Sequence, residues 1–141
     1  MKKMRTGIVA LCLALTALVF ACKGEGTVKA MQLGEAVRLK IAESGKLAAD
    51  DLTITFKAVT NDSRCPQGTQ CVTAGEADVV LTVKVGEKSQ DVTVKVGTDQ
   101  AKATVEPYAI RILALDPYPV ADQTIQDAAR EVELRVDRTN E

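Results

Sequence analysis

The sequence predicts an all-β fold, a small antiparallel β-sandwich, and three observations support this. Apolar and polar residues alternate with a period of two over several segments, which is typical of half-buried strands. Turn signals separate these segments at fairly regular spacing, and Val and Thr, which favour strands, are abundant. One sheet alone would leave an apolar face uncovered, so two sheets are expected to stack face to face. We expect about seven strands and a domain of immunoglobulin-like size, with one disulfide in a loop.

Each expected strand rests on its own pattern. The clearest alternation covers 77–85, with apolar residues at every second position, and Phe56 and Leu81 are expected to point into the core. The segment 108–115 is apolar on both faces, which predicts a central strand. The expected strands cover residues 37–41, 52–57, 77–85, 92–96, 101–105, 108–115 and 132–136. Turns are expected at 44–46, 86–89 and 116–119, and 120–130 is expected to form a loop or one helical turn.

The first 21 residues have the layout of a secretory signal peptide. A basic start with Lys2, Lys3 and Arg5 precedes an apolar run, 7–20, that is shorter than the roughly 20 residues of a membrane-spanning helix. Cys22 follows the small residue Ala21, which resembles the lipobox of bacterial lipoproteins, where this thiol is acylated and becomes the mature N-terminus. The alternative is a plain secreted protein with a free thiol at Cys22.

The sequence therefore predicts three parts: a lipoprotein signal peptide (1–21), a lipid-anchored tether (22–34) and the β-sandwich domain (35–141). Acyl chains on Cys22 would hold the protein in a membrane, which is the first expected partner. Lys23 occupies the position where an Asp signals inner-membrane retention in enteric bacteria. We therefore expect the cell envelope, and the outer membrane if the cell is Gram-negative, with an envelope protein as second partner.

Composition argues against several classes of function. The mature 120 residues carry 15 basic against 19 acidic side chains, so the net charge is −4, and no basic patch suggests a nucleic-acid partner. The chain has no His and no Trp, and its serines lie in none of the usual nucleophile motifs. We expect a protein that is not an enzyme and that needs no cofactor.

Four cysteines divide by position. Cys12 is removed with the leader and Cys22 carries the lipid, so Cys65 and Cys71 remain to form one disulfide in an oxidising compartment. Such a small ring contributes only about 2 kcal/mol by chain entropy, so it shapes a loop more than it supports the fold. Five residues lie between the thiols, whereas redox exchange normally uses two.

The segment around this ring is the most distinctive part of the mature chain. Asp62-Ser63-Arg64-Cys65-Pro66, then Gly68, Cys71-Val72 and Ala74-Gly75-Glu76-Ala77, resembles a motif of uncharacterised secreted or lipid-anchored bacterial β-sandwich proteins. Those proteins often carry Trp where Thr73 stands and often share the Pro117-Tyr118-Pro119 turn. The resemblance covers about residues 35–137 and implies the sandwich fold, but no activity.

Three functions remain open at this point. The first is a binding or scaffold module that uses the stapled loop, with Asp62, Arg64, Pro66, Gly68 and Tyr118 as candidate residues. The second is a protease inhibitor that inserts the rigid loop into a cleft. The third is a calcium site built from Asp62, Glu76 and Asp78. The structural alternative is a local Asp62–Arg64 pair within the loop, with Tyr118 packed against the end of the sandwich.

Overall fold

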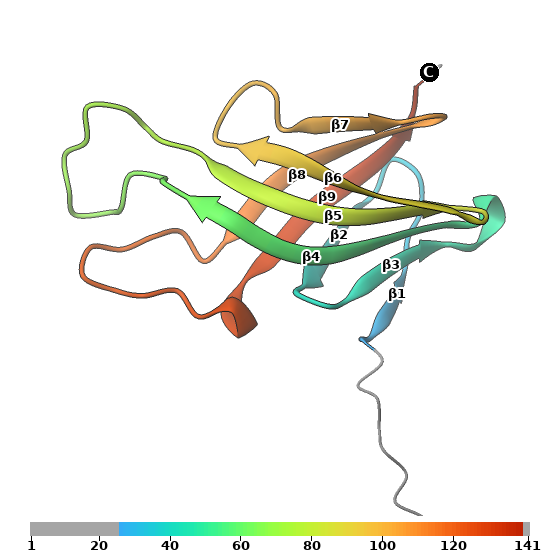
Figure 1. The fold of residues 1–141 in the computed structure, drawn as a ribbon, viewed down its shortest axis with the longest axis horizontal. Helices are drawn as coiled ribbons and strands as arrows, with labels where there is room; N and C mark the ends of the chain where they lie inside the picture. The colour runs from blue at the N-terminus through green and yellow to red at the C-terminus, as the bar shows by residue number, and fades with distance from the viewer. Residues whose placement is uncertain (1–25, 140–141) are drawn as a thin grey trace, which may run out of the picture.

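The computed structural model describes residues 26–139, which form two β-sheets packed face to face (Figure 1). One sheet has five strands in the order β1-β3-β4-β5-β6, and the other has four in the order β2-β9-β8-β7. The strands are β1 (Val28–Ala30), β2 (Ala36–Lys40), β3 (Ser44–Leu47), β4 (Leu52–Asp62), β5 (Ala77–Val85), β6 (Lys88–Val96), β7 (Lys102–Val105), β8 (Tyr108–Asp116) and β9 (Glu131–Arg138). The expected all-β sandwich with one loop disulfide is confirmed.

Two of the nine strands, β1 and β3, are absent from the expectation of about seven. β3 reads as a turn in the sequence because it begins with Ser44-Gly45, and β1 lies in the segment expected to be a tether. β1 pairs with β3 in parallel, so the five-stranded sheet is not purely antiparallel. The side chain of Met31, directly after β1, is buried. The expected tether is therefore wrong from Val28 onwards, where the chain already belongs to the sandwich.

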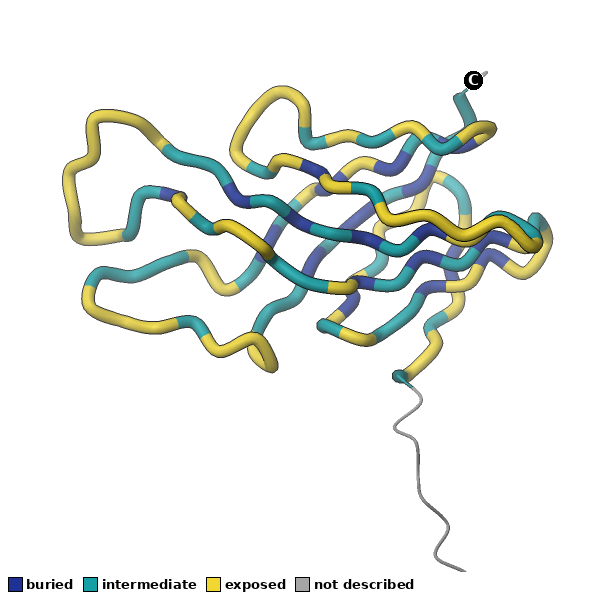
Figure 2. Tube along the Cα trace, viewed as in Figure 1, coloured by how far each residue is buried: buried dark blue, intermediate teal, exposed yellow. Residues whose placement is uncertain are grey.

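The core lies between the inward faces of the two sheets. Buried positions alternate with more exposed ones along β4, β5, β8 and β9 (Figure 2). Phe56 and Leu81 stand opposite each other on β4 and β5, and both are fully buried, as expected. The largest fully buried side chains are Phe56, Leu39, Leu52, Ile54, Leu81, Ile110, Leu134, Val79, Val83, Val94 and Val132.

Three connections gather at one end of the sandwich, on the left in Figure 1. They are the β4–β5 loop (63–76), the β6–β7 loop (97–101) and the β8–β9 loop (117–130), the last containing the short 3-10 helix η2 (Asp127–Ala129). The opposite end holds the 3-10 helix η1 (Ala48–Asp50) and the tight turns of two hairpins. Within residues 26–139, the structure contains no helix with the length and apolar character needed to cross a bilayer.

The described chain begins along one side of the sandwich. The backbone of Gly26 lies against the carbonyl of Ala42, and the amide of Ser44 donates a hydrogen bond to the Thr27 carbonyl at 2.9 Å. The Lys29 ammonium donates to the Arg38 carbonyl at 2.7 Å, which joins β1 to β2 across the two sheets. The N-terminal segment is thus attached at the edge where β1 and β2 meet.

The burial of Phe56 gives a stability prediction. Phe56→Ala should lower the free energy of unfolding by about 3–5 kcal/mol, because it leaves a cavity between the sheets. Thr53→Ala, on the outward side of the same strand, is the matched control and should change it by about 0.5 kcal/mol or less. Urea unfolding measures both values, and equal losses would contradict the observed register of β4.

Candidate functional site

The β4–β5 loop is fastened where it leaves the sheet. The amide of Ser63 donates to the Glu76 carbonyl at 2.8 Å, and the amide of Cys65 donates to the Ala74 carbonyl at 2.8 Å. Cys65 and Cys71 form the expected disulfide, with their Cα atoms 5.9 Å apart. These links continue the strand pairing of β4 and β5 into the loop. The two chain segments that lead to the ring are therefore hydrogen-bonded to each other, and we call them the stem.

Two glycines permit the shape of this loop. Gly75 has a φ of +70°, and a Cβ at this position would overlap the carbonyl of Ser63. No L-residue fits there without moving the stem, because both the conformation and the space exclude a side chain. Gly68 has a φ of +88° inside the ring and makes the bend that the sequence predicts.

The stapled ring packs against the β8–β9 loop. The amide of Gln67 donates to the Pro119 carbonyl at 2.9 Å, and the amide of Ala121 donates to the Gln67 carbonyl at 3.0 Å. These two hydrogen bonds belong to an isolated parallel bridge between Gln67 and Val120. Residues 63–76 and 117–130 therefore form one surface, which we call the loop platform.

A buried arginine joins the two halves of the loop platform. Arg64 is only 6% exposed, and its guanidinium makes a two-pronged contact with the Asp62 carboxylate, with Nε and Nη2 each 2.8 Å from one oxygen. Its Nη1 donates to the Leu115 carbonyl at 2.7 Å, and Nη2 also donates to the Pro117 carbonyl at 3.2 Å. Arg64 thus links the start of one loop to the start of the other.

Arg130 completes this cluster from the far end of the β8–β9 loop. Its Nη1 donates to the second oxygen of Asp62 at 2.8 Å, so a single carboxylate serves two guanidinium groups. Burial alone would raise the pKa of Asp62, but the hydrogen bonds from Arg64 and Arg130 outweigh it and lower this pKa to about 2. The Asp62 carboxylate is the counter-charge that both guanidinium groups share, so its loss would leave the buried Arg64 without an anionic partner.

The candidate binding residues take different places in this arrangement. Arg64 is not available to a partner, because it is buried and occupied by Asp62 and two carbonyl groups. Pro66 lies on a shallow hollow of about 530 Å³ beside the β8–β9 loop. Tyr118 is 44% exposed, and its ring lies under the guanidinium of Arg64 at 5.1 Å, so it is both packed and accessible. Val72, the residue directly after the ring, is fully exposed.

Arg130 and the bridge at Gln67 were not expected from the sequence. Arg130 follows a polar stretch without a periodic pattern, and no local motif links it to Asp62. Alternation along β9 begins only at the next residue. The topology of the two sheets brings Arg130 to Asp62 and Val120 to Gln67, although these residues are far apart in the sequence.

The three carboxylates considered for calcium do not meet. Asp62 stands opposite the buried Ala77, so it lies on the inner side of the sheet, whereas the neighbours of Ala77, Glu76 and Asp78, lie on the outer side. Lys95 pairs with Glu76 and lies 3.3 Å from an oxygen of Asp78. Among the described residues, no group of three or more potential metal ligands is assembled. The geometry does not support the predicted calcium site.

No family model, curated protein or solved structure matches this chain. The resemblance based on the Asp62–Pro66 motif accordingly stays a prediction.

The pKa of Asp62 gives a prediction about acid stability. Above pH of about 4, Asp62→Asn should unfold more easily than the wild type by about 3–5 kcal/mol, because the buried guanidinium of Arg64 loses its counter-charge and Arg130 keeps only the exposed Asp127. A lowered pKa means that the carboxylate stabilises the fold above its unfolded value of 3.8 and loses this effect as the pH falls through about 2. The stability difference should therefore narrow by about 2 kcal/mol between pH 5 and pH 2.

Urea unfolding at several pH values tests this expectation. Asp127→Asn is the control, because Asp127 reaches Arg130 from a side chain that is 82% exposed, and its profile should run parallel to that of the wild type. A difference between the wild type and Asp62→Asn that stays constant down to pH 2 would refute the role given to Asp62.

Proposed function

We propose that this chain is a lipid-anchored, non-catalytic module of the cell envelope that binds a protein partner through its loop platform. The observation that carries this proposal is the rigidity of the exposed ring. A disulfide, four backbone hydrogen bonds and the buried Arg64 hold residues 65–71 in one shape. A preorganised loop loses little conformational entropy on binding, which favours recognition of a protein.

The apolar groups of the loop platform support the same proposal. The described residues have four large apolar side chains with high exposure, and two of them, Val72 and Tyr118, belong to this surface. Tyr is enriched at protein interfaces, because it offers a large contact area at low entropic cost. The guanidinium of Arg64 packs against the ring of Tyr118 and holds it in position.

The position of Gly26 supports a close attachment to the membrane. Three residues lie between Cys22 and Gly26, a span of four peptide units, so the acylated cysteine would lie within about 14 Å of the edge formed by β1 and β2. Val28, two residues after Gly26, is 61% exposed, which suits a position at the bilayer surface. β1 lies away from the loop platform (Figure 1), so this attachment leaves the platform free for a partner.

Site-specific photocrosslinking in cells tests the binding surface. A photoreactive residue at Val72 should give an adduct of defined mass with an envelope protein, whereas one at Glu87, in the exposed turn at the opposite end, should give none. Replacing both Cys65 and Cys71 by Ser should weaken the Val72 adduct at least tenfold, while lowering the free energy of unfolding by only about 2 kcal/mol.

Equal adducts from Val72 and Glu87 would exclude the loop platform as the binding surface. If the adduct is a protease whose activity falls in a one-to-one complex, the protein is an inhibitor rather than a scaffold. A scaffold leaves the activity of its partner unchanged.

Fluorescence tests the attachment to the membrane. Because the chain contains no Trp, Val28→Trp and Val72→Trp each introduce a single reporter at an exposed apolar position. In the acylated protein reconstituted with brominated lipids, the Trp at position 28 should be strongly quenched and the Trp at position 72 hardly at all. Cys22→Ser should abolish acyl labelling, and similar quenching at both positions would contradict the proposed attachment.

A further inference from the structure

Three basic side chains stand directly opposite one another on the four-stranded sheet. Lys102 on β7 is paired with Arg111 on β8, and Arg111 is paired with Arg135 on β9. The residues next to them on β8 and β9, Ile112 and Leu134, face the core. The three basic residues therefore lie on the outer face of the sheet, in a row that we call the cationic row.

This arrangement opposes the stability of the sheet. Like charges directly opposite each other on neighbouring strands destabilise their pairing. Neighbouring strands lie about 4.8 Å apart, so the row concentrates three positive charges within roughly 10 Å. The mature chain has a net charge of −4, yet among the described residues Arg135 is the one member of the row with a carboxylate within ion-pair distance.

Arg38, on the same outer face of the four-stranded sheet, differs from the cationic row because it has acidic partners. Arg38 on β2 lies 3.5 Å from Asp116, 3.3 Å from Glu131 and 2.7 Å from Glu133. Arg135 has one partner, Asp137, at 3.0 Å. Among the described residues, Lys102 and Arg111 have no carboxylate within ion-pair distance.

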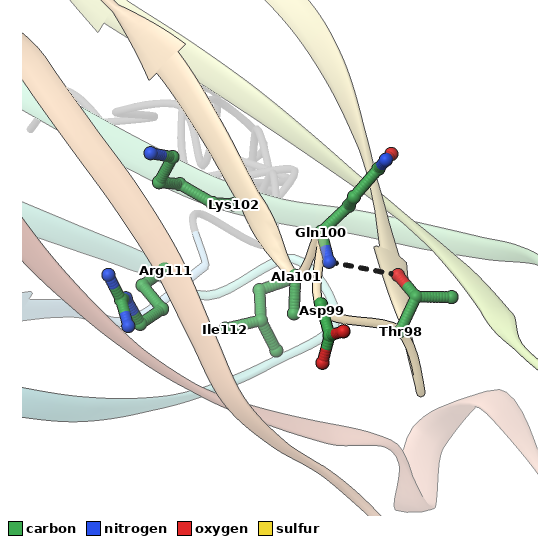
Figure 3. A pocket seen from close by; sticks show the side chains of 7 residues that line it. All are labelled: Thr98, Asp99, Gln100, Ala101, Lys102, Arg111 and Ile112. Carbon is green, nitrogen blue, oxygen red and sulfur yellow. Dashed lines mark hydrogen bonds between the residues drawn. The ribbon is translucent and has the colours of Figure 1, made fainter.

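The surface around Lys102 and Arg111 is hollowed on two sides. One hollow, of about 660 Å³, lies between these residues and the β6–β7 loop (Figure 3). Figure 3 shows both basic side chains extending in the same direction, with the carboxylate of Asp99 turned another way. The second hollow, also of about 660 Å³, continues past Arg135 to Glu106, whose carboxylate accepts a hydrogen bond from the Thr139 hydroxyl at 2.9 Å.

We propose that the cationic row binds a polyanion that carries phosphate groups. A guanidinium group pairs with phosphate through two parallel hydrogen bonds, and an adjacent ammonium adds a compact charge. A ligand with several negative charges in line would relieve the repulsion along the whole row, which a single carboxylate could not do. The two hollows give such a ligand room to extend beyond Arg111 in both directions.

The position of the row favours a polymer over the bilayer surface as the source of these phosphates. The row ends at β7, which is the edge of the sheet opposite β2. The proposed lipid attachment lies at the β1–β2 edge, so a membrane would meet the other side of the domain. The site itself rests on the strand register and not on the proposed anchoring or on the loop platform.

Binding of tripolyphosphate to the mature protein in neutral detergent tests this proposal. Tripolyphosphate should raise the Tm of the wild type more than sodium chloride at equal ionic strength does, and calorimetry should detect its binding. Lys102→Gln and Arg111→Gln should each weaken this binding at least tenfold. Arg38→Gln is the matched control, an arginine on the same face with acidic partners, and should bind like the wild type.

Without ligand, Arg111→Gln should be at least as stable as the wild type, because it removes a repulsive charge, so loss of binding is separable from loss of folding. Equal binding by Arg111→Gln and Arg38→Gln would overturn the proposal, as would a Tm rise no larger than that in sodium chloride. If phosphatidylglycerol added to the micelle raises the Tm and tripolyphosphate does not, the assignment to a polymer is wrong.

Discussion

The guanidinium of Arg64 is the group on which the loop-bearing end of the domain depends. It satisfies the Asp62 carboxylate and the carbonyl groups of Leu115 and Pro117 from a position that water barely reaches. These acceptors belong to strands of different sheets, β4 and β8, and to the loop that follows β8. One side chain therefore sets how the two sheets end and how their loops meet, which the disulfide alone, a bond within a single loop, cannot do.

The sandwich could be predicted from the sequence because its strands carry a local signal. In β5, Ala77, Val79 and Leu81 alternate with residues of intermediate exposure, and each of these residues occupies the face that its position predicts. β3 carries no such signal, since Gly45 is buried without an apolar side chain to mark it. The short β1 is recognisable only through its pairing with β3. The sequence of one segment does not reveal which other segment it pairs with.

In the candidate site too, the sequence predicts the contacts between residues close in the chain and misses those between distant residues. The disulfide follows from the cysteine count, and the pair of Asp62 and Arg64 follows from their proximity in the chain. The contributions of Arg130 and of the Gln67 bridge arise from long-range topology, so no local pattern identifies them. Carboxylates close in sequence suggested calcium, but the alternation of side chains across a strand sends Asp62 and Glu76 to opposite faces.

The short strand β1 would have a mechanical consequence if the protein is held by its N-terminus, as proposed. Any force on an anchor at Cys22 would reach β1 before the other strands, and β1 is held by three residues paired with β3 and by the contacts of Lys29 with Arg38 and Glu43. These residues can detach one pair at a time, which adds roughly 10 Å of extended chain. Force then passes along the chain to β2, which pairs with β9 of the core. With an anchor at Cys22, as proposed, β1 would be a short segment that extends before the pairing of the core strands is strained.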